Sequence, residues 1–294
     1  MKIAVVGSIN LDMTLCAPRI PLKGETLMGT DLSYAPGGKG ANQAVAMSRL
    51  GAEVWMFGCV GEDDHGRTVV ENLKNNGVHT EFIAALADVP TGLAVITVGE
   101  QDNTIIVIPG ANAKADMAYV EKICPELCIF DMVVLQHEIP LDAVEYVVRF
   151  CAENHIPVSL NPAPAAKVSQ EVVEAVTYLT PNEHEAKLIF GEDAHWEDLL
   201  RRYPEKLIIT QGSRGVSTVL KDGTLLQVPC TKVSVVDTTG AGDTFQGAFA
   251  VRITAGDSLE QALKFANTAA GLSTEKLGAQ SAMPTEAQVL NRMK

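Results

Sequence analysis

The stretch KIAVVG, residues 2–7, decides the fold class, because it is a short apolar run that ends on a glycine. Such a run is typical of a strand that is buried on both faces of a parallel sheet. Similar runs follow along the chain, and we interpret them as further buried strands: VWMFGCVG (54–61), MVVLQHEI (132–139), PVSLNP (157–162) and KLIITQG (206–212). The sheet is therefore expected to draw strands from most of the chain.

Segments with helical periodicity separate these runs. The predicted helices cover residues 41–50, 67–75, 141–153 and 183–190. Three of them stop near a glycine, which tolerates the left-handed backbone at a helix end. A further helix follows Asp257, where Asp257 and Glu260 form a D-x-x-E capping pattern. The alternation predicts an α/β fold with a doubly wound, mainly parallel central sheet flanked by helices.

Two early segments break this alternation. Residues 13–36 contain short strand-like pieces with no helix between them, and residues 91–109 read as two β-branched strands around a polar turn. We expect the two segments to pair into a small sheet that lies over the active site as a lid. Since no linker, repeat or low-complexity segment is visible, residues 1–294 are predicted to form a single domain.

Composition and net charge limit the kinds of molecule that the protein is expected to bind. The net charge is −13 and the isoelectric point is about 4.9, which disfavours nucleic acid because phosphate backbones attract basic surfaces. The six cysteines form no C-x-x-C pair, so we interpret them as reduced thiols of a cytoplasmic protein. Neither a signal peptide nor an apolar run long enough for a membrane span is visible.

The glycine-rich stretch DTTGAGDTF (237–245) carries the strongest chemical signal. It follows an apolar, strand-like run, VSVV (233–236), and leads into a predicted helix. Glycines let backbone N–H groups approach an anion, and a helix N-terminus adds positive potential. The carboxylate of Asp243 would repel a phosphate there unless it accepts a proton from an attacking hydroxyl. The alternative is that Asp243 only caps its own helix, and this fragment alone favours neither reading.

Further polar segments sit near strand ends, the edge at which open α/β sheets bind ligands. They are GSINLD (7–12), PGGKGANQA (36–44), LQHEIP (135–140), LTPNEHEAKL (179–188) and TQGSRG (210–215). In one of them, Asn182 and Glu185 lie one turn apart and offer oxygen donors suited to water-mediated Mg²⁺ binding. The P-loop fingerprint is absent, and so is the dinucleotide fingerprint G-x-G-x-x-G, which disfavours an NAD-dependent enzyme.

GGKGAN (37–42) and DTTGAGDTF resemble the two signature regions of the PfkB carbohydrate kinase family, and specifically its ribokinase branch. The spacing between them also fits, and the resemblance covers essentially the whole chain. It implies phosphoryl transfer from ATP to a sugar hydroxyl, with Asp243 as the general base. Gly240, Ala241 and Gly242 would form the anion cradle, with N–H groups from Ala241, Gly242 and Asp243. The resemblance also implies a homodimer that forms through the β lid.

The resemblance assigns the remaining site residues. The sugar contacts fall on Asn10, Asp12, Gly38, Lys39, Asn42, Glu138 and Asp243, all with the expected identity. The nucleotide contacts fall on Asn182, Thr210, Gly212, Ser213, Gly215, Gly242 and Asn267. Glu185 is associated with Mg²⁺ through water, and a K⁺ site falls on Asp237, Thr239, Ser273, Lys276, Gly278 and Ala282. Ala282 stands where the family often has a hydroxyl-bearing residue.

The full set of sugar contacts favours D-ribose, phosphorylated at O5 to D-ribose 5-phosphate. A mismatched hydroxyl would leave a buried polar group unpaired, at a cost of about 1–3 kcal/mol. The alternatives are a deoxyribose kinase, a fructokinase, a nucleoside kinase such as an adenosine kinase, or a sugar-binding regulator without activity. The intact GAGD sequence argues against the regulator. The lid residues do not decide the question of a nucleoside kinase.

Overall fold

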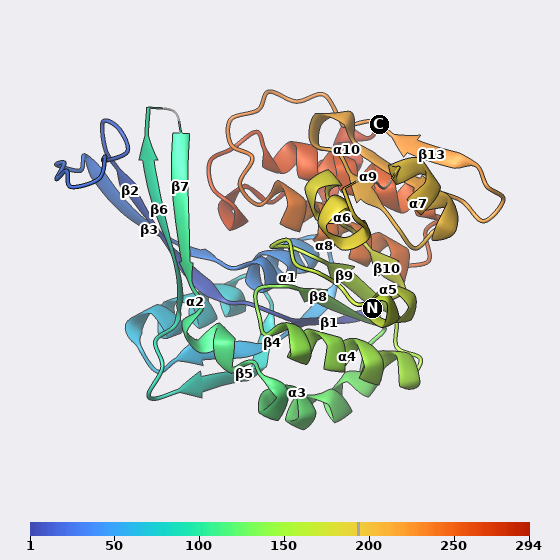
Figure 1. Cartoon of the computed structure of the whole chain (residues 1–294), viewed down its shortest axis with the longest axis horizontal. Coiled ribbons are helices and arrows are strands. Elements are labelled where there is room, and N and C mark those ends of the chain that lie inside the picture. Colours follow the sequence, from blue (N-terminus) through green and yellow to red (C-terminus); the bar gives the residue numbers. More distant parts are fainter. Residues whose placement is uncertain (101, 193–194) are drawn as a thin grey trace.

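The computed structural model describes residues 1–100, 102–192 and 195–294. Its centre is a six-stranded sheet in the order β10–β9–β8–β1–β4–β5 (Figure 1). These strands are β1 (Lys2–Val6), β4 (Glu53–Gly61), β5 (His79–Leu86), β8 (Met132–Gln136), β9 (Val158–Asn161) and β10 (Tyr178–Leu179). Every neighbouring pair runs parallel, which confirms the predicted parallel sheet.

The alternating side chains of β1 enter two separate cores. Ile3 and Val5 pack into the core on one face of the sheet, whereas Ala4 and Val6 pack into the core on the other. The first core includes side chains of α1 (Lys39–Arg49), α2 (Asp64–Asn75), α8 (Ala241–Thr254), α9 (Leu259–Ser273) and α10 (Glu286–Arg292). The second includes side chains of α3 (Met117–Ile123), α4 (Leu141–Glu153), α5 (Gln170–Ala175), α6 (Glu183–Phe190) and α7 (Trp196–Arg202). The doubly wound arrangement is therefore confirmed.

Strand order reverses at β1. From β1 the chain builds outward to β4 and β5 on one side, and then returns to place β8, β9 and β10 on the other. Such a reversal opens a crevice at the carboxyl ends of the central strands, where open α/β sheets bind their ligands. Gly7 follows β1, and Glu138 lies just past β8, so both are at this edge.

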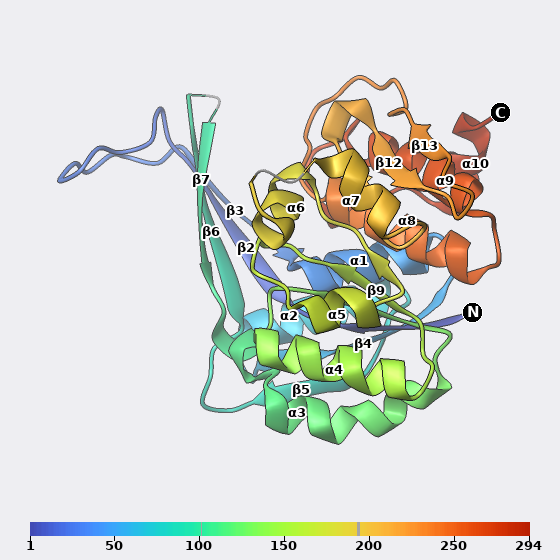
Figure 2. The same ribbon diagram turned by 45° about the vertical axis from the view of Figure 1, so that its right-hand side comes forward.

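The two early segments form one four-stranded sheet in the order β3–β2–β6–β7. Its strands are β2 (Asn10–Cys16), β3 (Asp31–Gly37), β6 (Gly92–Gly99) and β7 (Asp102–Ile108). Figures 1 and 2 show this sheet standing out from the rest of the molecule at one side. The pairing agrees with the expectation from the sequence, but the sheet begins at Asn10 rather than at residue 13. Asn10 and Asp12 therefore belong to a strand of the small sheet.

One predicted strand is only partly confirmed, and one strand-like run forms no strand. Only Ile209–Thr210 of the segment 206–212 forms a strand, β11, and it pairs antiparallel with β12 (Val216–Val219) in a separate sheet with β13 (Leu225–Val228). Single parallel bridges at Leu207 and Thr210 are its links to the β10 side of the central sheet. The run 233–236 forms no strand. The N–H of Val236 donates to the carbonyl of Thr274, and the side chains of Val235 and Val236 do not enter the core, since these residues are 61% and 58% exposed.

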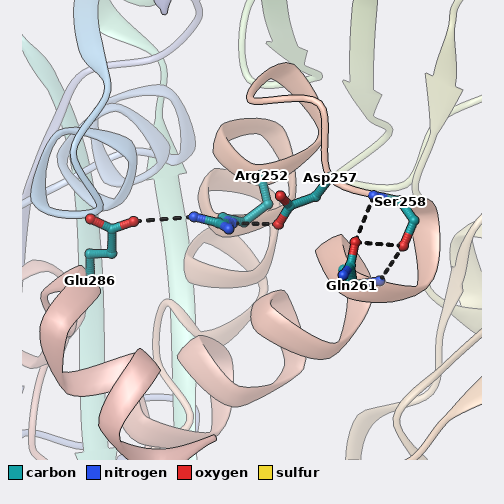
Figure 3. A network of polar contacts seen from close by, with 5 residues as sticks. All are labelled: Arg252, Asp257, Ser258, Gln261 and Glu286. Carbon is teal, nitrogen blue, oxygen red and sulfur yellow. Dashed lines mark hydrogen bonds and ion pairs between the residues drawn. The ribbon is translucent and has the colours of Figure 1, made fainter.

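The predicted cap of α9 is also corrected. Ser258 caps the helix: its hydroxyl accepts the N–H of Gln261, while the Gln261 side chain accepts the N–H of Ser258. Asp257 instead accepts a hydrogen bond from Arg252 Nε at 2.7 Å, and Arg252 also contacts Glu286 (Figure 3). The D-x-x-E pattern misplaced the cap by one residue, because S-x-x-Q is an equally good capping box.

The described residues also contain four 3₁₀ segments: η1 (Gly110–Lys114), η2 (Cys124–Ile129), η3 (Gly212–Arg214) and η4 (Gln280–Ala282). Three of them, η1, η3 and η4, contribute residues to the site described below. None of the helices in the described ranges is both long enough and apolar enough to cross a membrane.

Candidate active site

A cavity of about 610 Å³ lies against the N-terminus of α8. Its wall contains every residue that the family resemblance assigned to the nucleotide, together with the predicted anion cradle. These lining residues are Asn182, Glu185, Thr210, Gly212, Ser213, Gly215, Gly240, Ala241, Gly242 and Asn267, and Lys39 and Asp243 also reach the wall. Segments that are far apart in the chain therefore enclose one space.

The first turn of α8 forms the floor of a small anion cradle. Gly240 caps the helix with φ of 74°, and a Cβ there would lie 2.9 Å from the Cβ of Ala279, so glycine is required. The N–H of Ala241 donates to the carbonyl of Thr238 at 3.2 Å. The N–H groups of Gly242 and Asp243 have no acceptor within the described part of the chain. Two N–H groups, rather than the expected three, are thus free to bind an anion.

Asp243 is held by α1 and does not cap its own helix. Its side chain is 7% exposed, and its two carboxylate oxygens accept hydrogen bonds from Asn42 Nδ2 at 2.9 Å and Gln43 Nε2 at 3.1 Å. No side chain caps α8. Burial raises the pKa of Asp243 above its ordinary value, while the charge of Lys39 and the two amides oppose that rise. The capping alternative is therefore excluded.

Glycines of GGKGAN bring α1 close to the end of β1. Gly38 has φ of 87°, and a Cβ on it would lie 2.7 Å from the backbone nitrogen of Asn10. The next residue, Lys39, donates its backbone N–H to Glu138 Oε2 at 2.9 Å, and Ser8 Oγ donates to the same oxygen at 2.6 Å. Burial lowers the pKa of the Lys39 ammonium, but the nearby carboxylates of Asp243, Glu138 and Glu185 outweigh it and raise that pKa overall.

Asn10 and Asp12 line the same region from β2. The Asn10 side chain accepts a hydrogen bond from Asn112 Nδ2 at 2.6 Å. The carboxylate of Asp12 lies directly against Gly37, where a Cβ would come within 2.2 Å of it. Burial, followed by the charges of Glu138 and Asp243, raises the pKa of Asp12 to about 6. The carboxylates of Asp12, Glu138 and Asp243 thus act on one another, an arrangement that suits a ligand rich in hydroxyl groups.

Asn182 and Glu185 are engaged with each other. Asn182 caps α6, and the two residues form a reciprocal capping box with three hydrogen bonds of 2.8–2.9 Å. Burial raises the pKa of Glu185, opposed by its bonds to Asn182 and by the charge of Lys39. The described residues contain no group of three or more metal-ligating side chains. These donors fit a Mg²⁺ ion that is held by phosphates and reached through water, rather than one caged by protein.

The predicted cation residues are only partly brought together. Asp237 accepts hydrogen bonds from the N–H and hydroxyl of Thr239 and from the N–H of Gly278 at 2.8 Å. Burial opposes ionisation of Asp237, but these bonds outweigh it and lower its pKa. In the described ranges, Asp237 makes no hydrogen bond to Ser273, Lys276 or Ala282. The Ser273 hydroxyl instead donates to the carbonyl of Ala270.

Other site residues have structural roles or were missed. Asn267 donates to the backbone carbonyls of Val228 and Pro229, so it fixes the cavity wall. The sequence reasoning missed the polar side chains that support the sugar and base residues, which are Ser8, Gln43, Asn112, Asn161 and Gln280. Gln43 had a usable signal, because it follows Asn42 within GGKGANQA. Asn112 and Gln280 had none, since their partners are distant in the chain.

Comparison with known proteins agrees with this geometry. Residues 1–286 match the model of the pfkB family carbohydrate kinases. The chain belongs to this family. A Bacillus subtilis ribokinase is 45% identical over 288 residues, with 98% of both chains covered. A deoxyribokinase of Salmonella typhi is 32% identical, covering 97% of this chain and 96% of its own.

A comparison with solved structures also finds a ribokinase. An Arabidopsis thaliana ribokinase, complexed with ribose and ATP, superimposes with a TM-score of 0.89. It is 31% identical, and the match covers 99% of this chain and 98% of that one. This pfkB chain therefore shares its fold with a kinase whose structure contains both a sugar and a nucleotide.

Proposed function

We propose that the protein is a ribokinase, which transfers the γ-phosphoryl group of ATP to O5 of D-ribose and produces D-ribose 5-phosphate. The observation that carries the proposal is the place of Asp243. It is a buried carboxylate on the wall of the nucleotide cavity, and α1 connects it to the polar residues at the end of β1. Full-length similarity to a ribokinase supports ribose as the sugar.

Asp243 acts as the general base in this proposal. It accepts the proton of the ribose O5 hydroxyl while that oxygen attacks the γ-phosphorus in line. Its Asn42 and Gln43 bonds leave other lone pairs on the carboxylate free, because each oxygen can accept more than one hydrogen bond. The carboxylate can thus be fixed by α1 and still contact the substrate.

The first turn of α8 stabilises the charge that develops on the transferred group. The free N–H groups of Gly242 and Asp243 point from a helix N-terminus, where the helix dipole favours an anion. A Cβ on Gly242 would meet no atom within 4 Å, so this side of the turn is open to a phosphate. Lys39 supplies a positive charge at the same wall of the cavity.

The sugar lies against β2 and the loop after β8. Asn10, Asp12 and Glu138 offer hydrogen-bond partners to its hydroxyl groups, with Lys39 and Asn42 on the side of α1. Closure of the four-stranded sheet over this region excludes water, so that the phosphoryl group goes to the sugar rather than to solvent. A 2-deoxy sugar would leave one buried polar partner unsatisfied, which favours ribose over deoxyribose.

Glu185, held in place by its capping box with Asn182, would reach a Mg²⁺ ion through water. When bound with ATP, such an ion would neutralise part of the phosphate charge. A K⁺ ion would bind beside the loop of Asp237, whose lowered pKa keeps it negatively charged, with Thr239 and Gly278 adjacent. Backbone carbonyls near Ser273, Lys276 and Ala282 complete this proposed site.

The proposal extends to the organisation of the protein. Residues 1–294 act as one domain with a lid made of the four-stranded sheet, and two copies associate through that lid. The exposed apolar side chains of β7, including Ile105 and Ile106 at 56% and 67% exposure, support this contact. The cysteines in the described ranges are free, which supports a cytoplasmic location.

A substrate panel tests the function. ADP formation is measured with ribose, 2-deoxyribose, fructose and adenosine, each with and without K⁺, and the product position is read by ³¹P and ¹³C NMR. We expect ribose to have the highest kcat/KM. The phosphate of the product should be on O5, and turnover should be faster in the presence of K⁺. A clear preference for another sugar would reject the ribokinase proposal while leaving family membership intact.

A further inference from the structure

A chain of side-chain amides runs from α2 to the proposed base. Asn72 donates to Gln280 Oε1 at 2.6 Å, and Gln280 Nε2 donates to Asn42 Oδ1 at 2.9 Å. Asn42 then donates to Asp243 Oδ2. Each amide in this series donates to the next group on the way to the carboxylate. The three amides, from different parts of the chain, therefore form one hydrogen-bonded series with a single donor-to-acceptor direction.

A second series reaches the other carboxylate oxygen. Gln136, fully buried at the end of β8, donates to Gln43 Oε1 at 2.8 Å. Gln43 donates to Asp243 Oδ1 and also, at 3.3 Å, to Asn161. Each donor to the base therefore has its own carbonyl oxygen occupied by another amide.

The orientation of the Asn42 amide depends on Gln280. The oxygen and NH₂ ends of an amide have nearly the same shape, so sterics alone do not choose between them. If Asn42 turned around, its carbonyl oxygen would face the carboxylate and its NH₂ group would face the NH₂ group of Gln280. Both contacts are repulsive in a buried site. As long as Gln280 donates, the only satisfied orientation of Asn42 is the one that donates to Asp243.

Gln280 is itself fixed from two directions. Its Oε1 is occupied by Asn72, and its backbone carbonyl accepts from Arg49 Nη1 at 2.7 Å. The side chain is 6% exposed and does not line the nucleotide cavity. Its preceding neighbour, Ala279, packs against Gly240 at the start of α8. Gln280 therefore lies outside the nucleotide cavity and is held rigidly on the far side of Asn42 from Asp243.

We propose that Gln280 is a positioning residue, which fixes the Asn42 amide and thereby keeps Asp243 ionised and in a single orientation. This inference rests on the proposed role of Asp243 as the base. The charged groups that also face this site are Lys39 at the start of α1, Glu138 after β8 and Asp12 on β2. Any change in proton affinity must be assigned to Asp243 rather than to these neighbours.

Two variants distinguish the effect of losing the hydrogen-bond donor of Gln280 from the effect of adding a negative charge there. Gln280→Met removes the donor and keeps the length of the side chain. Gln280→Glu keeps the acceptor for Asn72. It replaces the donor to Asn42 with an acceptor, because a carboxylate only accepts hydrogen bonds. Gln288→Glu, an exposed capping residue of α10, is the matched charge control. The pH dependence of kcat and KM is measured for all three, and the pKa of Asp243 by ¹³C NMR of labelled aspartate, assigned with Asp243→Asn.

We expect Gln280→Glu to raise the pKa of Asp243 and to move the acidic limb of the kcat profile up by about one pH unit, so that kcat falls about tenfold at pH values below that limb. Gln280→Met should shift both in the same direction by less. The KM for ATP should stay within about twofold, and Gln288→Glu should match the wild type. A loss of packing alone would change stability without moving the Asp243 pKa.

The outcomes distinguish this inference from the proposed function. If folded Gln280→Glu and Gln280→Met keep the wild-type kcat and the wild-type Asp243 pKa, the positioning role is wrong even though the protein phosphorylates ribose. If the wild type prefers another sugar, the same comparison is made with that sugar. If no sugar in the panel is phosphorylated, the NMR titration alone decides whether Gln280 controls the proton affinity of Asp243.

Discussion

Asp243 shows how two opposing effects on one carboxyl can be balanced. Burial makes its ionised form expensive, because a low-dielectric surrounding solvates charge poorly. The charge of Lys39 and the amides of Asn42 and Gln43 stabilise that form. This balance suits the proposed base, which must be ionised before the attack and still have enough proton affinity to accept a proton from a hydroxyl group.

Replacing Asp243 tests its chemical role. Asp243→Ala removes the proton acceptor, and we expect kcat to fall by at least ~10², the lower range for a general base. Asp243→Asn retains the size and should fall similarly. Steady-state assays measure turnover, and calorimetric titration with ribose should show that binding is largely kept. Near-normal turnover in either variant would reject the role.

Asp12 makes stability depend on pH. Its pKa of about 6 in the folded protein lies above its ordinary value of 3.8, so the folded state binds the proton more tightly than the unfolded chain does. The associated stability is fully present below about pH 4 and is lost as pH rises through about 6. Asp12→Asn should therefore raise the free energy of unfolding at pH 7.5 by up to about 3 kcal/mol, with little gain at pH 4.

Urea denaturation at the two pH values measures this effect. Asp31→Asn, an exposed position on the same small sheet, is the control and should change little at either pH. A stabilisation of Asp12→Asn that is equal at both pH values would contradict the explanation. We expect the same variant to bind ribose poorly, so the enzyme retains a destabilising charge for its function.

At the scale of single residues, sequence reasoning could predict a role where the residue type itself indicates the chemistry. Glycines beside a lysine or an aspartate mark a turn that must approach an anion, and this signal is local. Gln43 and Asn112 could not be predicted in the same way. An amide is common everywhere, and its importance here comes from a partner that only the folded chain supplies.

Helix termini show the limits of local patterns. The sequence identified α4 and α6 with their bounds, because apolar periodicity and a following glycine or polar residue agreed. At α9 two overlapping capping patterns competed, and Ser258 prevailed because Asp257 has a better partner in Arg252. Strand predictions failed where an apolar run had no neighbour to pair with, as in residues 233–236.

The cap of α9 gives a direct prediction. Ser258→Ala removes the acceptor for the N–H of Gln261, and we expect the free energy of unfolding to fall by about 1 kcal/mol. Asp257→Asn weakens a partly exposed ion pair with Arg252, whose contribution is about 0–1 kcal/mol. Urea denaturation of both variants compares them. A larger loss for Asp257→Asn than for Ser258→Ala would return the cap to residue 257.

For the whole molecule, the strand order explains why one chain can gather so many distant residues. The reversal at β1 leaves a crevice, and the loops after β1, β8 and β10 all open on it. The alternation of strands and helices was enough to predict the sheet and this edge. The small sheet of β11–β13 was not predicted, because short antiparallel strands leave little periodicity in the sequence.

The proposed dimer is testable on β7. Ile106 is 67% exposed, so a charged side chain there stays in solvent in a monomer and costs little free energy. In a buried interface the same charge would be desolvated and would destabilise the dimer. Ile106→Lys should convert a dimer into a monomer in analytical ultracentrifugation, without change in the far-UV circular dichroism. Lys122→Glu, on α3 away from the small sheet, is the control. A wild-type protein that sediments as a monomer would reject the dimer.

The hydrogen bonds around the base join residues that are made at very different times. Asn42 lies 201 residues from Asp243 and 238 residues from Gln280 along the chain. While the protein is being translated, α1 emerges early, with an apolar face that will later pack on Gly247 of α8 and amides that still lack their partners. A nascent chain that contains α1 but not yet α8 therefore has these amides without Asp243, and its exposed α1 is a natural target for chaperones until α8 has been made.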